Sequence, residues 1–441
     1  MNAPLTPLEW SQLDESGRRS ALRRSAVTEA RELRSRVREL VRDVRARGDE
    51  ALREYTRRYD GAELVELAVS DAEFAAAGAT LAPSQAEAIS RAIDTITRFH
   101  QAQTGAPIRV ETAPGVVCER IDVPIHAVGL YVPAGTAPLP STAIMLAVPA
   151  RIAGCPRRIM CTPPRSDGTA DPAVLIAALA CGVTEIYKAG GAQAIAALAY
   201  GTHSVPRVDK IFGPGNAWVT AAKQLVSADA AGAAIDLPAG PSEVLVISDG
   251  SSRADFVAAD LLAQAEHSAD AQVLLVTDSR RHARECIDAL GRQLEDLPRR
   301  DIAARSVTGG RVILVADLET AFEVSNEYAP EHLILHVSAP RRWLPRVRNA
   351  GSVFLGGYTP ESLGDYCSGT NHVLPTGGHA RACSGLGVSD FVKRITVQEA
   401  SPDGLRALGP VAITLARMEG LEAHARAVSV RLSVLEAESA A

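Results

Sequence analysis

KIFGPGN, at residues 210–216, is the stretch that decides the fold class. Three residues typical of a buried strand lead into a glycine–proline–glycine turn, and Asn216 then opens a helical run that ends near Ser227. The sequence GGAQ at residues 190–193 repeats this arrangement after another strand-like run. Glycines let the backbone approach a ligand, and a helix N-terminus favours phosphate. Either turn alone could be a tight connection, but two on successive strand–helix units favour a shared ligand crevice.

The alternation of strands and helices continues on both sides of this stretch. Strands are expected at 127–132, 158–161, 185–188, 210–212, 243–247, 272–276, 311–315, 333–337 and 352–355. Helices are expected at 83–99, 141–153, 172–180, 192–200, 216–227, 253–267, 280–294 and 318–326. Such alternation predicts parallel sheets flanked by helices. The expected fold class is therefore α/β, with two stacked Rossmann-like parallel-sheet units, N-terminal helices and a helical C-terminal tail.

The 441 residues exceed what a single hydrophobic core usually organises, so two or three domains are expected. The predicted divisions are an N-terminal helical region at 1–112, a first α/β unit with the glycine turns at 113–238, a second α/β unit at 239–382 and a helical tail at 383–441. Either α/β unit can be discontinuous in sequence.

Two long helices are predicted near the ends of the chain. Apolar residues recur at helical spacing over 25–59, and the interspersed acids make its many arginines more typical of a solvated face than of a nucleic-acid site. A second long helix is predicted over about 415–436. A C-terminal helix of that length often packs on another subunit.

Composition narrows the class of protein. Hydrophobic residues make up 46% and charged residues 22%, which is ordinary for a globular protein. The net charge of -6 and the 4% of aromatic residues argue against nucleic acid as a partner. Apolar runs such as 143–148 are too short to cross a membrane, so no membrane partner is expected.

The seven cysteines show no CxxC pairing and are odd in number, which favours reduced thiols in a cytoplasm. A thiolate nucleophile for aldehyde oxidation is conceivable. Cys155 and Cys161 have apolar surroundings, however, and buried structural cysteines are the commoner case.

The hexapeptide YAPEHL, at 328–333, holds the strongest candidates for proton transfer. The residue before a proline favours extended geometry, so Glu331 and His332 should lie at the mouth of a strand. Neighbours on an extended chain point to opposite faces. We therefore expect them to point apart, to form no hydrogen-bonded dyad and to serve different reacting groups. An exposed glutamate beside a strand-edge histidine is an equally open interpretation.

The sequence QAEH, at 264–267, offers nitrogen and oxygen donors at the end of a predicted helix. Gln264 and His267 are three residues apart and share a face. Asp365 lies in a glycine-flanked loop and His424 on the tail helix. Such a donor set suits zinc in an open catalytic site, although a helix-end histidine with polar neighbours explains the spacing equally well.

Several longer motifs together resemble one family. They are VGLYVPAG at 128–135, GGAQAI at 190–195, FGPGN at 212–216, LPAGPSE at 237–243, QAEH at 264–267, NEYAPEH at 326–332 and GDYCSGTNHVLP at 364–375. In order and spacing the chain closely resembles the L-histidinol dehydrogenase family of histidine biosynthesis. Only about the first 110 residues and the extreme C-terminus look generic.

The resemblance implies a cytoplasmic homodimer that oxidises L-histidinol to L-histidine. It implies two NAD molecules used in turn, a bound histidinaldehyde between the two oxidations and one zinc ion per subunit. His332 would be the general base and Glu331 would activate water. The C-terminal tail would complete the partner's site.

The resemblance also assigns residues position by position. It implies Gln264, His267, Asp365 and His424 as zinc ligands, the last from the partner subunit, and Tyr131, Gln193 and Asn216 as NAD contacts. It implies Ser242, Gln264, His267, His332, Asp365, His372, Glu419 and His424 as the substrate-binding set.

Two other interpretations stay open. One is a paralogous NAD-dependent alcohol or diol dehydrogenase on the same scaffold. The other is a zinc-dependent hydrolase or a non-catalytic binding module, which predicts no affinity for the nicotinamide cofactor.

Overall fold

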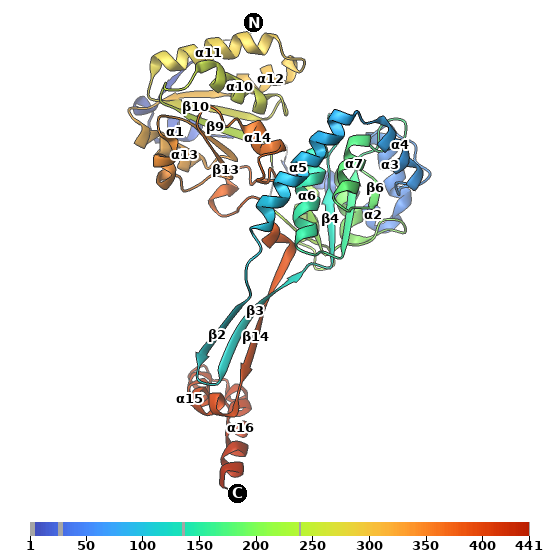
Figure 1. The fold of residues 1–441 in the computed structure, drawn as a ribbon, viewed down its shortest axis with the longest axis vertical. Helices are drawn as coiled ribbons and strands as arrows, with labels where there is room; N and C mark the ends of the chain where they lie inside the picture. Colours follow the sequence, from blue (N-terminus) through green and yellow to red (C-terminus); the bar gives the residue numbers. More distant parts are fainter. Residues whose placement is uncertain (1–4, 25–29, 135–136, 238–239, 441) are drawn as a thin grey trace. The chain divides into compact units, whose positions relative to one another are not determined.

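The computed structural model describes residues 5–24, 30–134, 137–237 and 240–440. The chain divides into two compact units (Figure 1). The first unit comprises Met1–Gln103 and Ile125–Phe391, and the second comprises Thr104–Pro124 and Val392–Ala441. Within the described ranges, no helix is both long enough and apolar enough to cross a membrane.

One parallel sheet of the first unit has the strand order β6-β5-β4-β7-β8. Its strands are β4 (Ala127–Tyr131), β5 (Arg157–Thr162), β6 (Glu185–Lys188), β7 (Lys210–Phe212) and β8 (Ala234–Ile235). The helices between them are α6 (Pro140–Ile152), α7 (Pro172–Ala180), α8 (Gly191–Tyr200) and α9 (Ala217–Ser227). Every residue of β4 is buried, as expected for a central strand that helices cover on both faces.

A second parallel sheet of the same unit has the order β1-β11-β10-β9-β12-β13. Its strands are β1 (Leu8–Glu9), β9 (Glu243–Ser248), β10 (Gln272–Thr277), β11 (Arg311–Leu314), β12 (His332–His336) and β13 (Ser352–Leu355). The associated helices are α10 (Ala254–Ala265), α11 (Arg280–Glu295), α12 (Arg300–Gly309), α13 (Leu318–Tyr328) and α14 (Glu361–Tyr366). In register, His332 of β12 lies opposite Val244 of β9 and Ser352 of β13.

The second unit is built on antiparallel strands. Strand β3 (Val116–Pro124) pairs with β2 (Ile108–Ala113) on one side and with β14 (Val392–Ala400) on the other (Figure 1). Helices α15 (Pro402–Met418) and α16 (Glu422–Ala440) follow β14 and pack on each other. Among its described residues only Gly404, Gly409 and Ala425 are buried, so this unit has almost no core of its own.

The remaining elements are helical and belong to the first unit. They are α1 (Glu15–Ala21), α2 (Ala30–Arg47), α3 (Asp49–Tyr59), α4 (Asp71–Thr80) and α5 (Pro83–Gln101), and the short 3-10 helices η1 (Trp10–Gln12), η2 (Pro340–Arg346), η3 (His379–Arg381) and η4 (Val388–Phe391).

The α/β prediction is confirmed, and every strand predicted between 127 and 355 is present. Two features of the prediction are wrong. The single helix over 25–59 is two helices, because Gly48 adopts a left-handed φ of 58°; residues 25–29 lie outside the described ranges. The helix over 415–436 is likewise interrupted, at Gly420 (φ 73°). The C-terminal tail is helical from Pro402 onward, as predicted, and strand β14 precedes these helices.

Candidate active site

The glutamate–histidine pair lies where α13 ends and β12 begins. Ala329 adopts a left-handed conformation (φ 54°) that closes α13, and Pro330 prevents the helix from continuing. Glu331 then precedes β12, and His332 is its first residue. Both side chains are buried, with exposed fractions of 5% and 4%. The exposed-glutamate interpretation is therefore wrong.

Glu243, the first residue of β9, contacts both members of the pair through its backbone. Its N–H donates to Glu331 Oε2 at 2.9 Å, and its carbonyl oxygen lies 3.1 Å from His332 Nδ1. A carbonyl oxygen only accepts, so Nδ1 carries a hydrogen. His332 Nε2 is buried and has no hydrogen-bond partner among the described residues. It is the ring nitrogen left to exchange a proton with a ligand.

Three carboxylates surround the His332 ring. Glu361 Oε1 lies 3.5 Å and Glu331 Oε2 3.7 Å from Nδ1, and Asp365 Oδ1 lies 3.7 Å from Nε2. Burial alone would lower the pKa of His332. The negative charges of Glu361, Glu331 and Asp365 outweigh burial and raise that pKa well above 6.5.

The carboxylates themselves differ. Burial raises the pKa of Glu331 to about 7, although His332 and the Glu243 N–H favour its ionised form. Burial also raises the pKa of Glu361 well above 4.5. Burial opposes ionisation of Asp365 too, but contact with His332 outweighs it and holds that pKa below 3.8. One site thus contains carboxyl groups suited to opposite protonation states.

The expectation that Glu331 and His332 point apart is wrong. Strand β12 starts at His332, so the alternation of a strand does not extend to Glu331, and both side chains turn toward Glu243. The 3.7 Å between Glu331 Oε2 and His332 Nδ1 is longer than a hydrogen bond, which agrees with the prediction of no hydrogen-bonded dyad.

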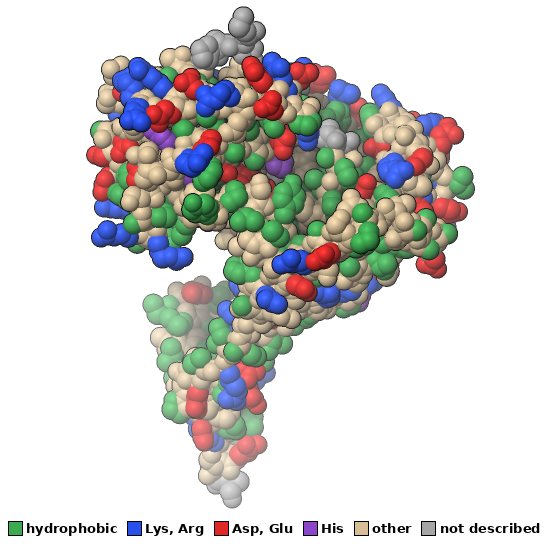
Figure 2. All heavy atoms as spheres, turned by 45° about the horizontal axis from the view of Figure 1, so that its top comes forward, with side chains coloured by type: hydrophobic (Ala, Val, Ile, Leu, Met, Phe, Trp, Pro, Cys, Tyr) green, Lys and Arg blue, Asp and Glu red, His purple; other side chains and the backbone are tan. Residues whose placement is uncertain are grey.

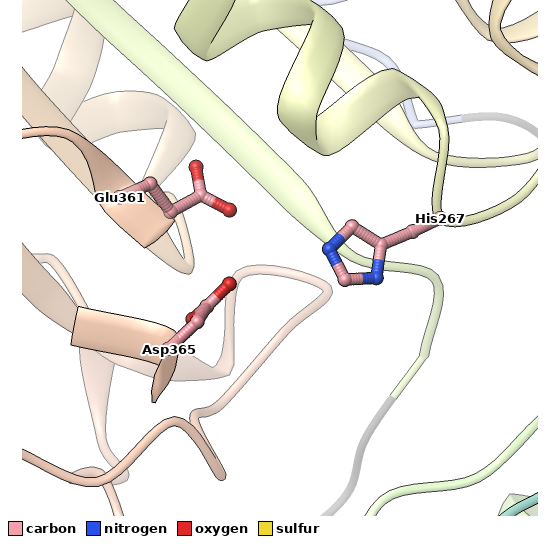
Figure 3. Close-up of side chains that lie close together, drawn as sticks. All are labelled: His267, Glu361 and Asp365. Carbon is pink, nitrogen blue, oxygen red and sulfur yellow. The ribbon is translucent and has the colours of Figure 1, made fainter. Parts of the chain in front are cut away.

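A possible metal-binding cluster lies beside the pair. His267 follows α10, and Glu361 and Asp365 lie four residues apart on α14, which places them on one helix face. One ligand atom from each lies within 4.8 Å of the other two. Figure 3 shows both carboxylates directed toward the His267 ring. Two of the predicted zinc ligands, His267 and Asp365, are therefore brought together.

The other predicted ligands have different environments. Gln264 is completely buried on α10, and both polar atoms of its amide are without a hydrogen-bond partner among the described residues. Because a buried amide normally has partners, this side chain fits a role as a ligand for a bound group. His424, on α16, and Glu419, at the end of α15, are exposed residues of the second unit.

The predicted NAD contacts lie at the carboxyl edge of the β4–β8 sheet. Tyr131 ends β4, and its buried hydroxyl accepts a hydrogen bond from Gly191 N at 3.0 Å. Gln193 lies in the first turn of α8 and Asn216 caps α9, so both follow strands of that sheet. The carboxyl ends of parallel strands are the usual place for ligands.

Two further residues of the predicted substrate set, Ser242 and His372, lie beside residues that contact the pair. Ser242 precedes Glu243 in the sequence, and His372 contacts Asp365. Ser242 is half-buried and directly precedes β9. His372 has both ring nitrogens engaged: Nδ1 is 2.8 Å from the Asp365 carbonyl oxygen and Nε2 is 3.1 Å from Thr142 Oγ1. In this structure His372 therefore supports α14, the helix that carries Asp365, and the expectation that Asp365 lies in a loop is wrong.

The cysteine prediction is confirmed for Cys155 and Cys161. Both thiols are buried, and burial raises the pKa of Cys155 to about 11 and that of Cys161 further. Neither is poised as a thiolate nucleophile.

Sequence reasoning missed Glu361, Glu243 and Arg24, which all contact the pair or its supports. The four-residue spacing of Glu361 and Asp365 was a usable signal for a shared helix face. Glu243 acts through its backbone, and Arg24 lies 219 residues away from it in the chain, so local patterns carried no signal for either.

The comparisons with known proteins agree with one another. A family model described as histidinol dehydrogenase matches residues 22–432. A histidinol dehydrogenase of Xanthomonas campestris pv. campestris is 57% identical over 98% of this chain and all of that protein. One of Photobacterium profundum is 52% identical over 97% of this chain and 96% of that protein. The crystal structure of histidinol dehydrogenase from Elizabethkingia anophelis aligns with a TM-score of 0.94 at 42% identity, covering 99% of this chain and 100% of that one.

Proposed function

The chain belongs to the histidinol dehydrogenase family, and on that premise we propose how its residues oxidise L-histidinol to L-histidine. Family membership makes it an NAD-dependent oxidoreductase of histidine biosynthesis. The observation that carries the residue assignment is the cluster of three carboxylates, from Glu331, Glu361 and Asp365, around the His332 ring, whose Nε2 has no hydrogen-bond partner among the described residues.

His332 is the general base of the alcohol oxidation. Its Nδ1 is held by the Glu243 carbonyl, so Nε2 takes the hydroxyl proton while hydride leaves the carbinol carbon. NAD, when bound, accepts that hydride. Tyr131, Gln193 and Asn216 are the proposed cofactor contacts. Their positions at the carboxyl edge of the β4–β8 sheet support this assignment.

Glu331 serves the second oxidation. Its carboxylate removes a proton from a water that adds to the bound histidinaldehyde, and the resulting hydrate loses a second hydride to give the carboxylate. A pKa near 7 suits this task, because the group is partly ionised at neutral pH and still a competent base. The buried position keeps the reactive aldehyde away from bulk solvent.

We propose one zinc ion per subunit, held by Gln264, His267 and Asp365 together with His424 of the partner subunit. The orphaned amide of Gln264 and the convergence of His267 with Asp365 support this donor set. Zinc, when bound, supplies a template for the imidazole and amine of the substrate and a positive charge that favours neutral His332. Ser242, Glu419 and His372 complete the proposed substrate-binding set.

A homodimer follows from the proposed role of His424. The second unit exposes large apolar side chains from all its elements, and Figure 2 shows apolar and charged side chains mixed over this part of the molecule. They include Ile108, Val110, Ile395, Val411, Leu415, Met418, Val430 and Val434. A unit with almost no core gains stability by covering these groups on a second copy. We further propose a cytoplasmic location, since all seven cysteines are free thiols.

Stoichiometry tests the proposed function. Purified protein with L-histidinol and NAD should form two NADH per histidine and release little aldehyde. A diol or alcohol that outcompetes L-histidinol would instead support a paralogous dehydrogenase. A zinc hydrolase or binding module would show no saturable NAD binding that weakens in Gln193→Ala or Asn216→Ala.

A further inference from the structure

We propose that Arg24 is a positioning residue for both proton-transfer groups and that it acts through Glu243. The inference rests on the proposed roles of Glu331 and His332 in the reaction. It concerns a residue far from the pair in sequence, on the segment between α1 and α2.

Arg24 holds the Glu243 side chain with a two-pronged ion pair. Its Nε lies 2.5 Å from Glu243 Oε1, and an Nη lies 2.9 Å from Oε2. The Glu243 side chain is only 3% exposed, and Gly377 N donates to its Oε1 at 2.9 Å. A planar guanidinium matched to a carboxylate in this way fixes direction as well as distance.

Fixing Glu243 fixes both members of the pair. The same residue donates its N–H to the Glu331 carboxylate and accepts the His332 Nδ1 hydrogen at its carbonyl. A rotation of this one peptide segment would therefore displace the carboxylate and the imidazole together. We infer that the Arg24–Glu243 ion pair sets the direction of His332 Nε2.

Arg24 also holds the turn that leads into the pair. An Nη donates to the carbonyl oxygens of Tyr328 at 2.8 Å and Ala329 at 3.3 Å, and the guanidinium lies 4.0 Å from the centre of the Tyr328 ring. Ala329 adopts a left-handed conformation that disfavours residues with a Cβ. One side chain thus stabilises a strained turn on one side of Glu331 and the β9 contact on the other.

A lysine cannot replace these contacts. It carries one ammonium group in place of a planar fork, so it cannot bind both oxygens of Glu243 in line and reach two carbonyls as well. Arg24→Lys should therefore retain the charge and lose the geometry. The activity of Arg24→Lys therefore shows whether Arg24 acts by orienting Glu243 or only by neutralising its charge.

The test uses the full-length holoenzyme and measures both half-reactions, with L-histidinol and with histidinaldehyde. Arg24→Ala should lower kcat of both by about 10- to 100-fold, because small displacements of catalytic groups have effects of this size. The KM for NAD should stay within about twofold, since the proposed cofactor residues lie on the other sheet. Arg24→Lys should also stay about tenfold or more below wild type.

Chemical rescue distinguishes positioning from loss of the fold. Millimolar guanidinium should raise kcat of Arg24→Ala several-fold and should leave His332→Asn inactive. Arg23→Ala is the matched control, because Arg23 is the exposed neighbour of Arg24 and should keep the kcat of the wild type. If Arg24→Ala does not fold, Arg24→Lys and Glu243→Gln carry the same expectation for kcat.

The proposal is overturned if Arg24→Lys and Glu243→Gln both keep kcat within twofold of wild type. It is also overturned if kcat of Arg24→Ala falls in parallel with NAD affinity and guanidinium restores neither. Failure of the proposed function looks different: the wild type would not reduce NAD with L-histidinol, or His332→Asn would be fully active.

Discussion

At the residue scale, protonation in this site is decided by burial together with the three carboxylates that share one imidazole. Glu331, Glu361 and Asp365 all lie within 3.7 Å of a His332 ring nitrogen. Burial raises the pKa values of Glu331 and Glu361, and the neighbouring carboxylates add to the rise, whereas contact with His332 outweighs burial and lowers the pKa of Asp365. Burial and the neighbouring charges thus favour the protonated form of Glu361 and the ionised form of Asp365.

The aldehyde half-reaction should depend on pH through Glu331. The raised pKa of about 7 means that the active carboxylate is lost as the pH falls below 7. The rate of histidinaldehyde oxidation should then fall about tenfold per pH unit below pH 6, as expected for a single required base. Glu331→Gln should slow this half-reaction strongly and spare alcohol oxidation, whereas His332→Asn should abolish both. Equal losses in both half-reactions of Glu331→Gln would contradict the division of roles.

Glu361 offers a second test at this scale. Its carboxylate is the largest of the influences that raise the pKa of His332, so Glu361→Gln should shift the acidic limb of the alcohol-oxidation profile to lower pH. Zinc content should be unchanged if the ligands are Gln264, His267, Asp365 and His424. A loss of zinc measured by elemental analysis would instead make Glu361 a ligand, as its place beside His267 and Asp365 allows.

At the element scale, the strand–turn–helix stretch at 210–216 requires its glycines, because the surrounding atoms leave no room for a side chain at these positions. Gly213 has a φ of 123°, and a Cβ there would collide with the carbonyl oxygen of Tyr131 on β4. Its N–H donates to Asp236 at 2.8 Å, and its carbonyl accepts from Lys223 Nζ at 2.8 Å. The turn is thereby fixed next to a proposed NAD contact.

Gly213→Ala should lower the free energy of unfolding by at least about 2 kcal/mol, through backbone strain and the clash with Tyr131. NAD affinity should fall with it. Gly291→Ala is the matched control. Gly291 is exposed on α11, with nothing within 4 Å of its added Cβ, so the change should be neutral or stabilising by up to about 1 kcal/mol. Urea unfolding of both variants checks this, and an unchanged midpoint for Gly213→Ala would contradict it.

The sequence predicts those helices and strands whose apolar residues follow the positions that are buried in the structure. Strands such as β9 and β10 are buried along their whole length, so their continuous apolar runs predict them well. Strands β2 and β14 are exposed at almost every residue. β2 forms a local hairpin with β3, whereas β14 pairs with β3 from a distant part of the chain. Apolar alternation in them is limited to Ile108 and Val110 in β2 and to Ile395 and Val397 in β14. The helix breaks at Gly48 and Gly420 were missed because amphipathic spacing continues past single glycines.

The candidate site was predictable only in part, for a related reason. Motif resemblance identified Glu331, His332, His267 and Asp365, and the structure brings these four side chains together. It could not identify Arg24 or Glu243, because an ion pair between distant segments leaves no local pattern. The sequence did predict the pair at the mouth of a strand, and the pair lies at the amino end of β12. It could not show that the amino end of β9 contacts both residues.

At the scale of the whole molecule, the second unit has the composition of an interface. Met418 is 77% exposed, and Leu415, one helical turn before it, is exposed too. In the described ranges, the buried residues of this unit are limited to two glycines and an alanine. A small unit with an open apolar surface normally packs on something else. His424 and Glu419 lie on that unit, and we propose that they act at the site of a second copy of the chain.

Subunit complementation tests that placement. Coexpression of His424→Ala and His332→Asn chains with different tags gives mixed dimers. If His424 acts in trans, each mixed dimer has one intact site, and random pairing restores about a quarter of wild-type activity. Pairing His332→Asn with Asp365→Ala is the control, because both residues belong to the first unit, and it should restore none. If His424 acts within its own chain, the first mixture also stays inactive. Removing the chain from Leu421 onward should likewise abolish zinc binding and activity together, because the tail then supplies no ligand to either site.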